Sequence, residues 1–90
     1  MSEQKDRLLA RVHIVEGLLR VLDDRFEFLA LVETSYDKRA ALETLISGWG
    51  MTEIQARHAL DITFSRATKL GREALVSELA ELRSAIDEAG

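Results

Sequence analysis

Residues 8–29 read LLARVHIVEGLLRVLDDRFEFL, and their apolar residues recur at alternating steps of four and three. The recurring positions are Leu8, Val12, Val15, Leu19, Leu22, Phe26 and Leu29. This spacing is that of the a and d positions of three heptads, which is typical of a helix that packs along a second helix. We therefore predict one long helix over about residues 3–33, which at 1.5 Å per residue is roughly 45 Å long.

A second, shorter heptad pattern lies near the C-terminus. Its apolar positions are Leu75, Leu79, Leu82 and Ile86. They predict a helix over about residues 70–88, with Thr68 as its N-terminal cap. Two heptad helices joined by shorter ones indicate an all-α fold, namely an antiparallel coiled-coil-like hairpin. Residues 1–90 then form one helical domain with a small head over residues 34–69.

The predicted head contains clear signals for helix ends. Thr34 or Ser35 is expected to cap a helix, and Gly48-Trp49-Gly50 is expected to end it. Thr52 followed by Gln55 is a capping box that opens a helix expected to reach about Ala67. This helix is apolar on two sides. Ala56, Leu60 and Phe64 lie on one side, and Ile54 and Ile62 on the other. Since a chain of 90 residues has little deep interior, we expect one of these sides to contact a partner.

The composition excludes several classes of protein. There is no cysteine, which excludes a disulfide framework and thiolate metal sites. Hydrophobic residues make up 47% and charged residues 31%, too apolar for a disordered chain and too charged for a membrane span. Twelve basic and sixteen acidic residues give a net charge of −4, which predicts no strong direct binding of nucleic acid. The polar N-terminus lacks a signal sequence, so we expect a cytoplasmic protein without membrane contact.

We find no motif that indicates catalysis, a cofactor or a metal. His13 and Glu16 are one helical turn apart, but a metal site needs a third or fourth ligand and no second such pair is present. No serine lies between elbow glycines, and Gly48-Trp49-Gly50 lacks the lysine of a phosphate-binding loop. We therefore predict no catalytic, cofactor-binding or metal-binding residues, and interpret Trp49 as the anchor of a helix corner.

Three stretches of the chain, in order, resemble the A subunit of bacterial type II DNA topoisomerases, the family of DNA gyrase and topoisomerase IV. The first covers residues 11–19 together with Leu22, Asp23 and Asp24. The second covers residues 53–56 together with Leu60 and Asp61. The third consists of Leu70, Arg72, Glu73 and residues 78–82. The resemblance extends over about residues 7–86.

This resemblance implies the coiled-coil arm of the A subunit with the small helical domain at its tip. In that family two such tips meet and form the exit gate for the transported DNA duplex. It implies a homodimer, with an interface that includes Ile54, His58, Ile62 and Phe64. The family's catalytic tyrosine lies upstream of this segment, and Tyr36 does not inherit that role. We therefore expect a stand-alone interaction module without enzymatic activity. A topoisomerase A subunit is its second candidate partner, which it would bind as a regulator.

The gate region also departs from the family pattern. The residues that differ are His58, Ala59, Ile62, Thr63, Phe64, Lys69 and Gly71. The gate is therefore expected either to associate with itself with altered specificity or to bind a different partner.

One alternative belongs to another class. Small all-helical chorismate mutases are similar in size and are also built on one long helix. Such an enzyme needs several basic side chains that converge on the substrate's two carboxylates, and Arg11, Arg25, Lys38 and Arg39 are the candidates. Converging buried arginines would favour the enzyme, whereas dispersed arginines on the surface would favour the interaction module.

Overall fold

The computed structural model describes residues 3–89, which form helices and no β-strand, so the predicted all-α class is confirmed. The elements are α1 (Glu3–Asp23), α2 (Arg25–Thr34), α3 (Lys38–Gly48), α4 (Glu53–Leu60), the 3-10 helix η1 (Phe64–Ala67) and α5 (Lys69–Ala89). None of the helices in this part of the chain is both long and apolar enough to cross a membrane.

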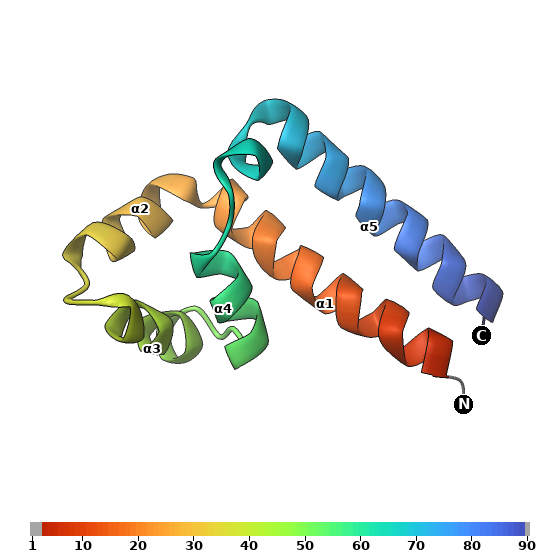
Figure 1. The fold of residues 1–90 in the computed structure, drawn as a ribbon, viewed down its shortest axis with the longest axis horizontal. Coiled ribbons are helices and arrows are strands. Elements are labelled where there is room, and N and C mark those ends of the chain that lie inside the picture. The colour runs from red at the N-terminus through yellow and green to blue at the C-terminus, as the bar shows by residue number, and fades with distance from the viewer. Residues whose placement is uncertain (1–2, 90) are drawn as a thin grey trace.

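Helices α1 and α5 form an antiparallel hairpin, which we call the arm (Figure 1). Their contact contains an apolar cluster, the arm cluster, which consists of Val15, Leu18, Leu22 and Leu75. Ion pairs cross the same contact, with Arg11 Nε 2.6 Å from Glu78 Oε2 and Arg83 Nη2 2.8 Å from Glu16 Oε2. Heptad positions predicted from both ends of the chain therefore meet in one seam.

The first helix is shorter than predicted, because it is interrupted at Asp24. Asp24 leaves the helical conformation, with φ −110° and ψ 40°, and the chain turns into α2. At this interruption, the Arg25 Nε donates a hydrogen bond to the Leu22 carbonyl oxygen at 3.1 Å. The same guanidinium donates to the Ala67 carbonyl at 3.1 Å. Two adjacent aspartates have low helix propensity, and the turn directs α2 towards α3 instead of along α5.

Helices α2, α3 and α4 form the head, on the far side of the molecule from the chain termini (Figure 1). They surround a second apolar cluster, the head cluster, made of Val21, Leu45, Met51, Ala56 and Ala59. Trp49 packs against it, edge-on to Phe28 at a centroid distance of 6.3 Å, with the Arg20 guanidinium 5.0 Å from its ring centroid. The predicted end of α3 is confirmed, since Gly50 takes the left-handed φ of 72° that reverses the chain.

The capping predictions have mixed outcomes. The box at the start of α4 is confirmed, because Thr52 Oγ1 accepts from the Gln55 N–H and the Gln55 side chain accepts from the Thr52 N–H. Thr68 caps α5 as predicted and accepts from the Gly71 N–H at 3.0 Å. The cap of α3, however, is Asp37 and not Thr34 or Ser35. A carboxylate competes well for the free N–H groups of a first turn, and the Asp37 Oδ1 accepts from the Ala40 N–H at 2.9 Å.

Helix α4 ends at Leu60, so the predicted continuation to Ala67 is wrong. Asp61 closes the helix, Thr63 is extended, and η1 follows. The break lets two nearby apolar residues reach different clusters. Leu60 packs against the head cluster and Ile62 against the arm cluster. In a continuous helix, the side chains of Leu60 and Ile62 would point to nearly opposite sides. The turn after Leu60 instead leaves both side chains half-buried.

The head is fixed to the arm where α4 packs on α1. Gly17 is buried at this contact, and a Cβ atom built there would lie 3.0 Å from Cγ of Gln55. The Gln55 side chain donates to the His13 carbonyl at 2.8 Å, and the His13 Nε2 is 2.6 Å from Thr52 Oγ1. The close approach at Gly17 thus lets the capping residues of α4 also bind the backbone and side chain of α1.

Candidate protein-interaction surface

The structure places the four predicted interface residues in different environments. On α4, Ile54 is 56% exposed and His58 is exposed as well. Ile62 follows the helix and is half-buried against the arm cluster. Phe64 lies in η1, but its side chain is outside the described part of the structure. Ile54 and His58 are therefore accessible to a partner, and Ile62 has partners in its own chain.

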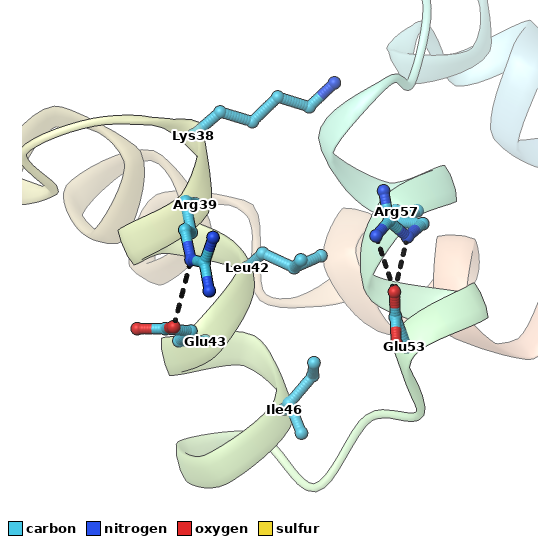
Figure 2. Close-up of a pocket in the computed structure, with 7 residues that line it drawn as sticks. All are labelled: Lys38, Arg39, Leu42, Glu43, Ile46, Glu53 and Arg57. Atoms are coloured by element: carbon cyan, nitrogen blue, oxygen red, sulfur yellow. Dashed lines mark hydrogen bonds and ion pairs between the residues drawn. The ribbon is translucent and has the colours of Figure 1, made fainter.

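A groove of about 520 Å³ lies between α3 and α4, next to this surface. Figure 2 shows Leu42 and Ile46 of α3 directed towards α4 across the groove, with charged side chains around them. The cations are paired. Arg57 Nη2 is 2.5 Å from Glu53 Oε2, and Arg39 Nε is 3.5 Å from Glu43 Oε2.

Lys38 is the third cation that lines this groove, and its Nζ is 2.7 Å from Asp61 Oδ1. This hydrogen bond, together with the charge of Lys38, holds the pKa of the exposed Asp61 below its ordinary value. Every cation that lines the groove thus has a carboxylate within the chain. The groove therefore lacks the excess positive charge that would recognise an anionic ligand.

Helix α2 carries an exposed apolar surface, and two of its residues, Phe26 and Leu29, were predicted to lie in the arm seam. Phe26 is 83% exposed and Leu29 53%, although both continue the heptad spacing of α1. Val32 is 42% exposed, and Tyr36, just beyond the helix, is 95% exposed. The turn at Asp24 removes these residues from α5. Two adjacent aspartates inside the heptad pattern were the only signal for it in the sequence.

Beside this surface lies a second groove, of about 540 Å³, between α2, the start of α3 and the end of α4. Its apolar lining is formed by Phe28, Leu29, Val32, Ala41, Leu60 and Ile62. Tyr36 and Asp37 of the α2–α3 connection and Lys38, the first residue of α3, also line it. This groove is therefore lined by more apolar residues than the one between α3 and α4.

The basic residues considered for an enzyme do not converge. Arg11 pairs with Glu78 on the arm, where the hydrogen bond holds the pKa of Glu78 below its ordinary value. Arg25 binds backbone carbonyls at the turn between α1 and α2. Lys38 and Arg39 begin α3 and have carboxylate partners of their own. The four side chains are thus bound at three separate places.

The histidine–glutamate pair considered as a metal fragment is also engaged elsewhere. His13 contacts Thr52, and Glu16 pairs with Arg83. Within residues 3–89 no group of three or more His, Asp or Glu side chains is arranged to hold a metal ion.

Comparison with known proteins identifies homologous segments in bacterial topoisomerases. The chain is 43% identical to the DNA gyrase A subunit of Campylobacter jejuni over 77 residues, which are 86% of this chain and 9% of that protein. It is 45% identical to the DNA gyrase A subunit of Aminobacterium colombiense over 78 residues, 87% of this chain and 10% of that protein. The DNA topoisomerase 4 A subunit of Staphylococcus epidermidis is 37% identical over 78 residues, with the same coverage.

No family model matches the chain. The chain spans about a tenth of the length of these curated relatives. The comparisons and the structure together support one conclusion: the chain is an all-helical homologue of a segment of about 80 residues of the gyrase and topoisomerase IV A subunits.

Proposed function

We propose that this chain is a protein-interaction module that self-associates through its head, and that it corresponds to the coiled-coil and exit-gate segment of the A subunits. The homology to a single segment of these subunits supports this assignment. The architecture also supports it, since an antiparallel arm carries a small helical head at one end.

The observation that carries the proposal is the uneven distribution of exposed apolar side chains. Most of the large apolar side chains exposed within residues 3–89 belong to α2, α3, α4 and the connection at Tyr36. They are Phe26, Leu29, Val32, Tyr36, Ile46 and Ile54. Leu29, Val32 and Tyr36 line one groove, and exposed apolar side chains gathered in one region of a small protein are typical of an interaction site, because leaving them in water is unfavourable.

The same geometry favours a binding role over an enzymatic one. A mutase of the considered type requires basic side chains around one apolar pocket. Here Arg11, Arg25 and Arg39 are bound at separate places, and the groove beside Arg39 is balanced in charge. The proposed module therefore acts by association alone.

The proposal is tested by the mass of the protein in solution. Size-exclusion chromatography with light scattering at about 10 µM is expected to give twice the chain mass of 10.1 kDa. A monomer at every concentration up to about 100 µM would contradict self-association. The same measurement on a mixture of this protein with a purified gyrase A subunit tests whether that subunit is a second partner. In that case a complex containing both proteins is expected.

A further inference from the structure

The geometry points to α2 as the docking surface for the second copy, with the two α2 helices antiparallel about a twofold axis. This inference rests on the proposed self-association and names the face that performs it. The face consists of Phe26, Leu29, Val32 and Tyr36 together with the groove beside them, and we call it the α2 face. The α4 residues suggested by the sequence lie outside it.

The α2 face carries an exposed ring at one end and a groove towards the other, which a twofold axis can bring together. Phe26 projects from the N-terminal end of α2, with 83% of its surface exposed. The groove of about 540 Å³ lies towards the C-terminal end, beside Val32 and Tyr36. Phe26 and Val32 are separated by about 9 Å along the helix axis. In an antiparallel pair, the Phe26 ring of each copy reaches the groove of the other.

The available area, if all of it is covered, reaches the lower limit for a specific dimer. A buried aromatic side chain removes about 150–250 Å² from water, and both aromatic residues of the α2 face are nearly fully exposed. With Leu29 and Val32, the face offers about 500 Å² per copy. Two copies thus bury about 1,000 Å², the lower limit for a specific interface.

The helix dipole favours the antiparallel arrangement. Glu33 lies exposed in the last turn of α2, where a negative charge interacts unfavourably with the dipole of its own helix. In the antiparallel pair, each Glu33 faces the N-terminal end of the partner's α2. The dipole is favourable to a carboxylate at that end, where Asp24 and Glu27 already lie and Arg25 binds carbonyl oxygens of its own chain.

The α4 surface is a weaker candidate. Ile54 is its one large exposed apolar residue within the described part of the helix. Its neighbour in sequence, Glu53, forms the ion pair with Arg57. Docking a second copy on this surface would require the removal of water from these charges.

The test compares Phe26→Glu with the matched variant Ile54→Glu in the full chain. Both positions are exposed on helices, so circular dichroism should show both variants folded. Because each substitution occurs twice in a twofold dimer, Phe26→Glu is expected to raise the dissociation constant at least a hundredfold, measured by sedimentation. Ile54→Glu is expected to change it less than threefold. Tyr36→Glu, outside any helix, is expected to act like Phe26→Glu and replaces it if that variant loses helicity.

The outcomes separate the two proposals. A monomeric parent protein would overturn self-association and the docking face together. A dimeric parent whose affinity is unchanged by Phe26→Glu and Tyr36→Glu would overturn the docking face alone. If Ile54→Glu dissociates the dimer while Phe26→Glu and Tyr36→Glu do not, the contact lies on α4 and the docking face is overturned.

Discussion

Three glycines provide a test of the packing, because the same substitution to alanine meets a different neighbour at each. Gly17, Gly48 and Gly71 all lie in helices, and none has a positive φ. Alanine at a helical position is favoured by up to about 1 kcal/mol over glycine. The remaining difference among the three variants therefore reports what the added Cβ atom contacts.

At Gly48 the nearest atom to an added Cβ is the Thr44 Cγ2 at 3.8 Å, an ordinary contact. Gly48→Ala should thus stabilise the protein by about 0.5 kcal/mol. At Gly71 the Cβ would overlap the carbonyl oxygen of Ser65 and the backbone of Arg66. Because backbone at the corner of η1 and α5 has to move, Gly71→Ala should destabilise the fold by about 2 kcal/mol. For a chain of this size, that corresponds to a decrease in Tm of about 8–16 °C.

Gly17 is the intermediate case. The added Cβ would lie 3.0 Å from the Gln55 side chain, which can move only if its hydrogen bonds to the Thr52 N–H and the His13 carbonyl are broken. These bonds contribute about 1 kcal/mol each, so the net loss after the helix gain should be about 1 kcal/mol. Thermal unfolding is expected to rank the three variants, from most to least stable, as Gly48→Ala, Gly17→Ala and Gly71→Ala. Equal stability of Gly71→Ala and Gly48→Ala would refute the packing of η1 against α5.

Further perturbations test the core, the arm and the charge. Leu45→Ala, at a fully buried position, should lower the free energy of unfolding by about 3 kcal/mol in chemical denaturation. The exposed control Ile54→Ala should change it by less than about 0.5 kcal/mol, and similar losses for both variants would contradict the assigned burial. The hydrogen bond from Arg11 lowers the pKa of Glu78 in the folded protein. The ion pair of these two residues therefore stabilises the fold fully above the ordinary carboxyl pKa of 4.5, and this stabilisation is lost as the pH falls below that value. The Tm of Glu78→Gln should therefore be lower than that of the parent at pH 7, and the gap should close towards pH 3; a gap of the same size at both pH values would contradict the role of this ion pair. With a net charge of −4, the protein should bind duplex DNA more weakly than about 10⁻⁴ M at physiological salt, and retention of DNA at nanomolar protein in a gel-shift assay would argue against this.

The sequence was sufficient for much of the fold because its local patterns agree with its packing. The a and d positions Val15, Leu22 and Leu75 are buried together in the arm cluster. Thr52 with Gln55 begins a helix as their spacing predicts. These features depend on residues a few positions apart, which sequence periodicity records directly.

The errors arose where tertiary contacts override a local pattern. Phe26 and Leu29 continue the heptads of α1, yet the turn at Asp24 leaves them exposed on α2. Similarly, the apolar spacing after Leu60 is consistent with a continued helix, but Ile62 has to reach the arm cluster. The α2 face could not be found from the sequence, because it exists only once α2 has turned away from α5.

The central claim is that two copies associate through their heads. Since the chain has no cysteine, single nitroxide labels can be attached at Thr44→Cys on the head or at Ser84→Cys on the arm, both exposed positions. Pulsed electron paramagnetic resonance then measures the distance between the two labels of a dimer. The arm belongs to a molecule 44 Å long, so head-to-head association predicts a shorter distance between Thr44→Cys labels than between Ser84→Cys labels. A shorter distance between the arm labels would show that the copies associate along their arms and would contradict the account.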